Sequence, residues 1–359
     1  MKKLFIELLQ VSFGNREQLS RTPSDAEWIC LFQVAQKQAI AGVLIAGIDK
    51  LPIEQHPPQN LLLQWIGLTV QVEQGNHLLN QRCIELQKLF SDAGFRTCIL
   101  KGQGNALMYP NPLKRQSGDI DIWVDGRIKD IVSFLITRCD ETLLTNAYHH
   151  TDFPIWNDVE VEVHWRPSWK SSPIHNRRLQ RWVKENKEKQ FTNIDLATGL
   201  HIPTWDFNVV YLLQHMYLHI FQEGFGMRQV VDYYYLLKSD KRMEVQDLEK
   251  TLRRLDLYHF AGAVMYVLRE ALGMEEKFFI VPVDERRGAF LLEEIMQSGN
   301  FGRYDERNRE LAQKTGISRS LARLKRQYRF LRDYPLEVLC APFQVYHVIW
   351  RKLKLWRWE

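Results

Sequence analysis

Apolar residues recur along this chain with two different spacings. Up to about residue 92 they come every three or four positions, and the longest such stretch ends at Gly94. The same spacing returns at residue 204 and continues to the end of the chain. It predicts helices with one buried face, and a glycine is a common signal for a helix end. Both ends of the chain are therefore expected to be helical.

Residues 93–169 show the spacing that is typical of strands. RTCIL at 96–100 is a short apolar run, whereas DIDIWV at 119–124 and DVEVEVHW at 158–165 alternate between polar and apolar residues. Such runs predict buried or half-buried strands. Helical spacing in the connecting segments completes the predicted order of strand, helix, strand, helix, strand, strand.

These elements predict an α+β protein that is mostly α, with a small mixed sheet flanked by helices. The expected parts are an N-terminal helical region (1–92), the mixed-sheet core (93–169), a linker or mobile flap (170–203) and a C-terminal helical domain (204–359). The third part is expected to be a linker or flap because it is polar and contains prolines.

The composition is that of an ordinary globular protein. Hydrophobic residues make up 45% and charged residues 25% of the 359 residues, which excludes a low-complexity disordered chain. Five cysteines without a CxxC pair indicate a reducing compartment, so we expect a cytoplasmic protein. No apolar run approaches the roughly 18 residues of a membrane-spanning helix, and no signal peptide is recognisable.

The formal net charge of +5 is concentrated near the C-terminus. The last segment, FQVYHVIWRKLKLWRWE at 343–359, mixes tryptophans with lysines and arginines. A helix of this kind can lie on an anionic membrane surface. It can equally cover a core with its tryptophans and leave its cations in water, and the sequence leaves both interpretations open.

Two carboxylates lie one residue apart in the second predicted strand. Side chains two positions apart point to the same face, roughly 6 to 7 Å from one another, so Asp119 and Asp121 share one side while Ile120 and Ile122 face the core. A divalent ion such as Mg²⁺ would neutralise the paired acids and keep positions free for water and phosphate. The wet face of a half-exposed strand is the simpler alternative.

The last predicted strand offers further ligands, because Glu160, Glu162 and His164 share one face of it. If this strand lies beside the strand that carries the aspartates, a third carboxylate completes a site for two metal ions.

The segments around the aspartates suit phosphate binding. Gly118 allows a close approach of backbone or phosphate, and Lys101 with Gly102 sits where a strand meets a helix N-terminus, which favours anions. Lys114 and Arg115 lie on the intervening loop.

The segments LKGQGNALMYPNPLKRQSGDIDIWV (100–124) and VEVEVHWRP (159–167) resemble the nucleotidyltransferase fold of the DNA polymerase beta superfamily. More closely, they are similar to an uncharacterised bacterial nucleotidyltransferase family. Its hallmarks are a Leu-Lys-Gly turn, an arginine before Gly-Asp-Ile-Asp, and a later strand with an acid, any residue, His and Trp. QHMYLHIFQEGFGMRQVVDYYYLL (214–237) extends the likeness, which covers roughly 95 to 240.

By this resemblance, Asp119 and Asp121 bind magnesium, and two ions are expected. Glu162 is the third metal-binding and catalytic acid, with Glu160 as the fallback. Gln103 stands where the superfamily usually has serine, so the serine contact to the γ-phosphate has no counterpart here. The residues expected to bind the nucleotide are Lys101, Gly102, Arg115, Gly118, His164, His215 and Arg228.

The resemblance implies in-line attack of an acceptor hydroxyl or phosphate on the α-phosphorus of a nucleoside triphosphate, with release of pyrophosphate. The acceptor is open: a small molecule, a sugar, a lipid-linked precursor or a protein. A catalytically inactive nucleotide-binding or scaffold protein of the same fold is the alternative. Nucleic acid is not an expected partner, because the chain lacks a recognised nucleic-acid-binding motif.

Two further patterns occur on predicted helices. His215, His219 and Glu223 fall on one face, but the HExxH signature of zinc proteases is absent, so a histidine near the nucleotide or in the core is expected. Arg228 and Asp232 are four residues apart, which predicts an ordinary helix ion pair. A role of Arg228 in the cleft is the alternative.

Overall fold

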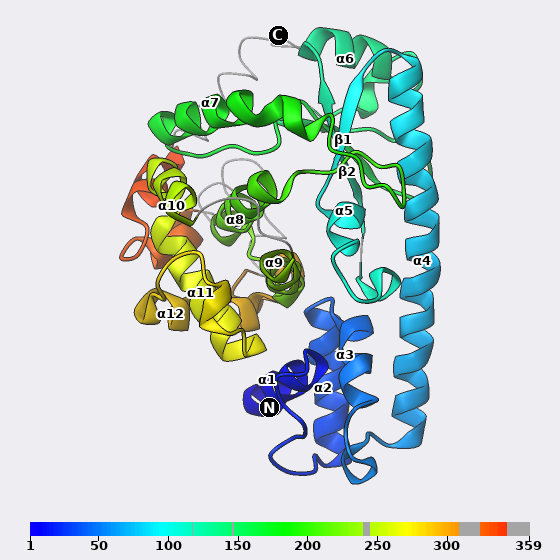
Figure 1. The fold of residues 1–359 in the computed structure, drawn as a ribbon, viewed down its shortest axis with the longest axis vertical. Coiled ribbons are helices and arrows are strands. Elements are labelled where there is room, and N and C mark those ends of the chain that lie inside the picture. The colour runs from blue at the N-terminus through cyan, green and yellow to red at the C-terminus, as the bar shows by residue number, and fades with distance from the viewer. Residues whose placement is uncertain (117, 146, 240–244, 309–323, 343–359) are drawn as a thin grey trace.

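Four short strands from the middle of the chain form one mixed sheet. The computed structural model describes residues 1–116, 118–145, 147–239, 245–308 and 324–342, and it arranges the strands in the order β1-β2-β4-β3 (Figure 1). Strand β2 pairs with β4 in parallel, while β1 and β3 run antiparallel to their neighbours. The strands are β1 (Arg96–Leu100), β2 (Ile120–Asp125), β3 (His150–Asp152) and β4 (Val161–His164).

Two helices complete the predicted order of elements in this region. Helix α5 (Gly102–Ala106) connects β1 to β2, and α6 (Ile128–Leu135) lies between β2 and β3. The prediction of an α+β chain with a small mixed sheet is therefore confirmed.

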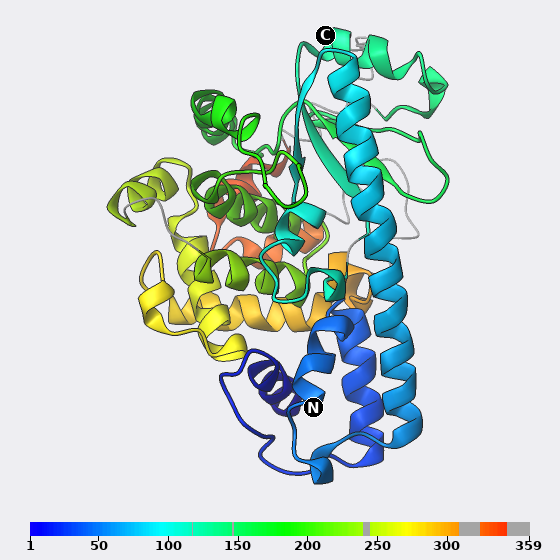
Figure 2. The same ribbon diagram turned by 45° about the vertical axis from the view of Figure 1, so that its right-hand side comes forward.

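The longest helix, α4 (Gln59–Asp92), runs along one side of the molecule from the N-terminal helices to the sheet (Figures 1 and 2). Near its start, the indole nitrogen of Trp65 donates a hydrogen bond to the carbonyl of Ala41, at 2.8 Å. It ends two residues before Gly94, whose φ of +83° suits a glycine. The helices before it are α1 (Lys2–Ser12), α2 (Asp25–Lys37) and α3 (Ala41–Ile48).

One face of the sheet is apolar because polar and apolar residues alternate along its strands. Ile120 and Ile122 of β2 are almost fully buried, and they share a hydrophobic cluster with Leu86 and Phe90 of α4 and Ile131 of α6. This packing confirms that the two isoleucines face the core. It also leaves the opposite face of β2 for the acids.

The segment expected to be a linker or flap differs from that expectation, because it contains helix α7 (Pro173–Gln190). The Ser172 hydroxyl accepts a hydrogen bond from a backbone N–H of the first turn, which is a usual helix start. Leu179, Trp182 and Val183 are buried, and Trp182 stacks on Phe207 with ring centroids 4.8 Å apart. Three apolar residues at helical spacing thus give a mostly polar segment one buried face.

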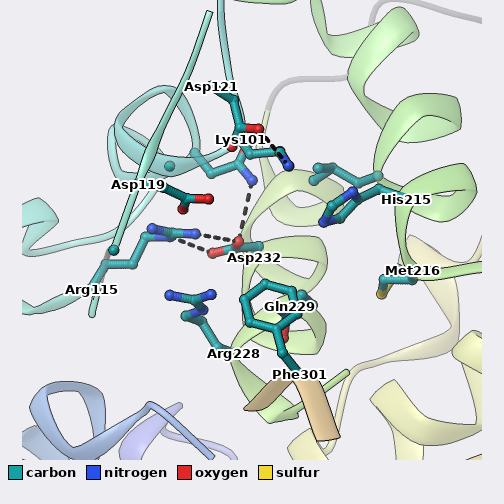
Figure 3. Close-up of a pocket in the computed structure, with 14 residues that line it drawn as sticks. Lys101, Arg115, Asp119, Asp121, His215, Met216, Arg228, Gln229, Asp232 and Phe301 are labelled. Carbon is teal, nitrogen blue, oxygen red and sulfur yellow. Dashed lines mark hydrogen bonds and ion pairs between the residues drawn. The ribbon is translucent and has the colours of Figure 1, made fainter. Parts of the chain in front are cut away.

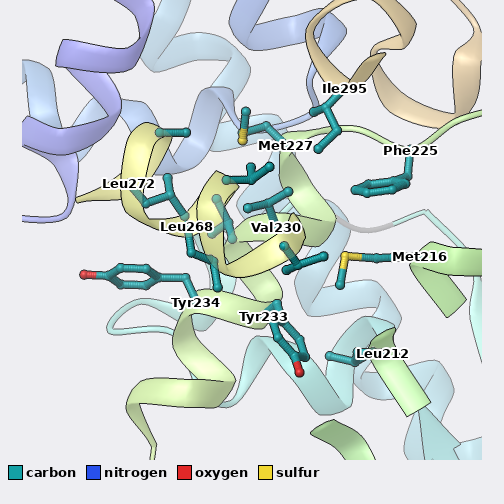
Figure 4. Close-up of a cluster of buried hydrophobic side chains, with 14 of the residues drawn as sticks. Leu212, Met216, Phe225, Met227, Val230, Tyr233, Tyr234, Leu268, Leu272 and Ile295 are labelled. Carbon is teal, nitrogen blue, oxygen red and sulfur yellow. The ribbon is translucent and has the colours of Figure 1, made fainter. Parts of the chain in front are cut away.

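The C-terminal half is helical over its described residues, as expected. Figure 4 shows Val230 and Tyr233 of α9 among side chains from neighbouring helices, including Leu268 of α11. Almost every residue of α9 is buried, so the polar side chains on this helix lie inside the protein. The helices are α8 (Trp205–Gln222), α9 (Met227–Lys238), α10 (Val245–Arg254), α11 (Tyr258–Leu272) and α12 (Glu285–Ser298).

Short 3₁₀ turns join several of these elements. They are η1 (Ile53–Gln55), η2 (Pro112–Lys114), η3 (Glu141–Leu143), η4 (Glu276–Phe278), η5 (Asn300–Gly302), η6 (Glu306–Asn308) and η7 (Tyr328–Phe330). Among the described residues, no helix has both the length and the apolar character that crossing a membrane requires. The basic aromatic segment 343–359, considered above for membrane binding, lies outside the described residues.

Leu86 tests the packing of α4 on the sheet. Its side chain is fully buried, so we expect Leu86→Ala to lower the free energy of unfolding by about 2 to 5 kcal/mol, through lost contacts and a cavity. Chemical denaturation followed by circular dichroism measures the loss. Lys88→Ala, on the exposed side of the same helix, is the control, and equal small losses in both variants would contradict the packing.

Candidate active site

The register of the sheet places three acids in one row. Asp121 lies opposite Glu162 across the parallel β2–β4 pair, and Glu162 lies opposite Asp152 across the antiparallel β4–β3 pair. One ligand atom each from Asp121, Glu162 and His164 lies within 4.8 Å of the others. Strand β4 therefore places Glu162 beside Asp121 of β2, which the sequence alone had left conditional. Glu160 is exposed, just before β4, and lies outside this group.

Asp121 is buried and is neutralised by the protein itself. Its Oδ1 accepts from the Lys101 ammonium at 2.8 Å and lies 2.8 Å from His164 Nε2. The same His164 nitrogen lies 3.2 Å from Glu162 Oε2. Burial opposes charge on His164, but its hydrogen bonds to the two carboxylates raise its pKa to about 9. His164 is therefore a cation at neutral pH.

The turn after β1 aims Lys101 at this group. Lys101 has φ of +48° and Gly102 has φ of +31°, a left-handed conformation that is costly for a lysine. Burial works against the charge of Lys101, yet Asp121 raises its pKa above the ordinary value. The expected passage from a strand into a helix at Lys101 and Gly102 is confirmed. Gln103 does not line the pocket: its amide donates to Asn80 of α4.

An open pocket lies between this edge of the sheet and helices α8 and α9 (Figure 3). The volume not filled by protein atoms, including the solvent space at its mouth, is about 470 Å³. Eight residues nominated from the sequence line it: Lys101, Gly102, Arg115, Gly118, Asp119, Asp121, His215 and Arg228. Glu162 and His164 are not part of the lining, but both touch it through Asp121.

Asp119 points into the pocket (Figure 3). It is partly exposed, and no described residue makes a hydrogen bond or an ion pair with its carboxylate. Asp119 therefore differs from Asp121, whose charge is already compensated.

A buried ion pair forms the floor of the pocket, and the sequence did not predict it. Arg115 donates to Asp232 through Nε and Nη2, at 2.7 and 2.8 Å. Asp232 also accepts from the Tyr109 hydroxyl at 2.5 Å and from Asn105 at 3.2 Å. Although burial opposes charge on Asp232, Arg115 keeps its pKa below the ordinary value. The expected helix pair of Arg228 with Asp232 is replaced by this longer-range pair.

Arg228 consequently faces the pocket without a carboxylate partner among the described residues. It is buried, it donates to the carbonyl of Gln116 at 2.9 Å, and its guanidinium lies 5.3 Å from the ring centre of Phe301. Burial, followed by the nearby charge of Arg115, lowers its pKa below the ordinary value. The cleft role considered for Arg228 thus agrees with its position.

A comparison with protein families identifies the family of this chain. The model of a family described as uncharacterised nucleotidyltransferase matches residues 24–273, well over half of the chain. The chain belongs to this nucleotidyltransferase family. Comparisons with curated proteins and with solved structures gave no significant match.

The nucleotidyltransferase match includes both walls of the pocket. It contains the whole sheet, which carries the aspartates, and helices α8 and α9, which carry His215 and Arg228. Phe301 lies beyond it, so the part of the pocket that Phe301 lines is built by this chain outside the matched residues.

His215 is the histidine that faces the pocket from α8. Burial, followed by the charge of Lys101, lowers its pKa well below the ordinary value, so the ring is neutral. The neighbouring His219 instead lies 2.8 Å from Glu223 through its Nδ1. The two histidines of this helix face are therefore engaged differently.

Sequence reasoning also passed over His149 and His150 at the start of β3. Their rings contact each other and that of His164. Burial, with the other histidines nearby, lowers the pKa of both His149 and His150. The two consecutive histidines in the sequence could have drawn attention to this place. The local sequence did not show which strand they would pair with.

Asp232 tests the floor of the pocket. We expect Asp232→Asn to lower the free energy of unfolding by about 3 to 5 kcal/mol, because it leaves the buried Arg115 without its carboxylate. Denaturant unfolding measures the change. Glu249→Gln, which breaks a more exposed ion pair with Arg253, should leave stability almost unchanged. A loss for Asp232→Asn no larger than for this control would contradict a structural role of the pair.

Proposed function

We propose that this protein is a magnesium-dependent nucleotidyltransferase, which moves a nucleoside monophosphate from a nucleoside triphosphate to an acceptor and releases pyrophosphate. The observation that carries the proposal is a pocket lined by Asp119 and Asp121, with a carboxylate oxygen of Glu162 within 4.8 Å of one of Asp121. The family match supports nucleotidyl transfer in general. The metal, the leaving group and the catalytic residues are the parts proposed here.

The residues present fit a divalent ion. Carboxylate oxygens are the ligands that Mg²⁺ prefers in proteins, and Asp119 offers a carboxylate that no described side chain engages. His164 pairs with both Asp121 and Glu162, and Lys101 pairs with Asp121; a metal ion bound to these acids would take over part of the charge compensation that the two cations supply. Asp119, Asp121 and Glu162 would hold two Mg²⁺ ions, which would neutralise phosphate charge during transfer.

The chain's own cations would orient the triphosphate. Lys101 and Arg228 enter the pocket from opposite walls (Figure 3), so both can contact an anion between them. Arg115 is fixed in direction by its two bonds to Asp232, which pre-orders it toward the same space. Neutral His215 can exchange hydrogen bonds with the nucleotide or the acceptor hydroxyl. Preordered charge of this kind stabilises a phosphoryl transition state.

Label transfer tests the proposal directly. Purified full-length protein is incubated with each radiolabelled nucleoside triphosphate and Mg²⁺ in the presence of cell-lysate fractions. We expect one or more triphosphates to label an acceptor and release pyrophosphate, and a chelator to stop both. Nucleotide binding by calorimetry without any transfer would instead support the inactive nucleotide-binding or scaffold protein.

Asp119→Asn tests the metal-binding acids. We expect this variant to lose at least about 3 kcal/mol of transition-state stabilisation, roughly a hundredfold in rate, because an amide neutralises no metal charge. Pyrophosphate release at saturating triphosphate measures the effect. The control is Asp130→Asn, on the surface of α6, where it pairs with Arg127. Full activity of Asp119→Asn would refute the assignment.

Arg228→Gln tests the cationic wall. We expect the KM for the triphosphate to rise at least tenfold, about 1.4 kcal/mol, because the pocket loses a guanidinium that has no carboxylate partner among the described residues. Initial rates over a range of triphosphate concentrations give KM and kcat separately. Arg127→Gln, outside the pocket, should leave KM unchanged, and an unchanged KM for Arg228→Gln as well would exclude nucleotide contact by this residue.

A further inference from the structure

Three histidines lie close together where β4 pairs with β3, the edge strand of the sheet farthest from β1. His150 lies directly opposite His164 in the antiparallel β3–β4 pair, and His149 precedes it. One ligand atom from each of the three lies within 4.8 Å of the others. The proposed transfer reaction makes no use of His149 or His150.

The distances in this cluster suit one small cation. His149 Nε2 lies 3.0 Å from His150 Nδ1, His150 Nδ1 lies 3.9 Å from Glu162 Oε2, and Glu162 Oε2 lies 3.2 Å from His164 Nε2. A tetrahedral zinc with bonds of about 2.0 to 2.1 Å keeps its ligand atoms about 3.3 Å apart. The observed separations of 3.0, 3.2 and 3.9 Å lie around this ligand-to-ligand distance, so small side-chain movements would fit them to one ion.

An ion would bind the rings of His149 and His150 directly, and at His164 it would displace the proton that lies toward Asp121 and Glu162. Within the described residues, the one hydrogen bond of His149 Nε2 is to His150, and the buried Nδ1 of His149 has no hydrogen-bond partner. The side chains of His150 and Glu162 are 19% and 29% exposed, which leaves an approach for an ion. A hydrogen bond between two neutral imidazoles would explain the contact of His149 with His150. It would not explain why a ligand atom of His164 also lies within 4.8 Å of those of His149 and His150.

We propose that His149, His150 and His164, beside Glu162, form a second metal site, which takes a borderline divalent ion such as Zn²⁺ rather than Mg²⁺. Imidazole nitrogens suit zinc and its neighbours in the first transition row, whereas Mg²⁺ prefers a shell of oxygens. The site shares His164 with the acidic group at the pocket. An ion held here would therefore draw His164 away from Asp121 and Glu162, although its binding does not depend on nucleotidyl transfer.

Zinc titration of the metal-free, full-length protein tests the site in the absence of nucleotide. Competition with a chromophoric chelator gives stoichiometry and affinity, and Co²⁺ in place of zinc gives a visible spectrum that reports four-coordination. We expect one equivalent to bind, and the double variant His149→Ala/His150→Ala to bind at least tenfold more weakly. The pair His149→Gln/His150→Gln, which preserves volume and polarity, repeats the test if the alanine variant fails to fold.

Two controls separate this site from other histidines and from the transfer reaction. His77→Ala removes an exposed histidine of α4 and should leave zinc affinity unchanged. Asp119→Asn, expected to slow transfer roughly a hundredfold or more, should also bind zinc normally, so failure of one proposal is distinguishable from failure of the other. No stoichiometric zinc binding by the unmodified protein, or equal affinity in the histidine double variants, would overturn the second site.

Discussion

The parallel pairing of β2 with β4 is the interaction on which the site depends. It sets Asp121 beside Glu162, and two residues further along it sets Trp123 beside His164. Because side chains alternate along a strand, a shift of one residue would turn the acids toward the apolar core. Burial of Ile122 against α4 opposes such a shift. Hydrophobic packing on one face of the sheet thus determines which carboxylates meet on the other.

Charge compensation explains how so many ionised groups can lie inside the protein. Asp121 is paired with Lys101 and His164, and Asp232 is paired with Arg115. Buried charges without partners are strongly destabilising. Asp119 and Arg228 have no ion-pair partner among the described residues, and both line the pocket. They give this space one carboxylate and one guanidinium whose charges no described ion pair neutralises, which suits an anion that arrives with a cation.

Much of the core could be predicted because its signals are local. Alternation over residues 119–124 predicted a strand with Ile120 and Ile122 inside, and helical spacing up to Gly94 predicted the long helix that supports it. The same reasoning did not predict the helix at residues 173–190. This segment has few apolar residues among many charged ones, so its sequence gives only a weak helical pattern. Its buried face becomes clear in the structure, where Trp182 packs against Phe207.

By itself, the sequence determined which chemical groups stand close along the chain: two acids at strand spacing, a lysine and glycine at a turn, an arginine before the acids. The tertiary structure alone decided which groups that are distant in the sequence come into contact. Arg115 pairs with Asp232, 117 residues away, and Arg228, only four residues from Asp232, does not. His150 faces His164 through an antiparallel pairing. Such partners depend on how helices and strands pack, and no local spacing encodes that packing.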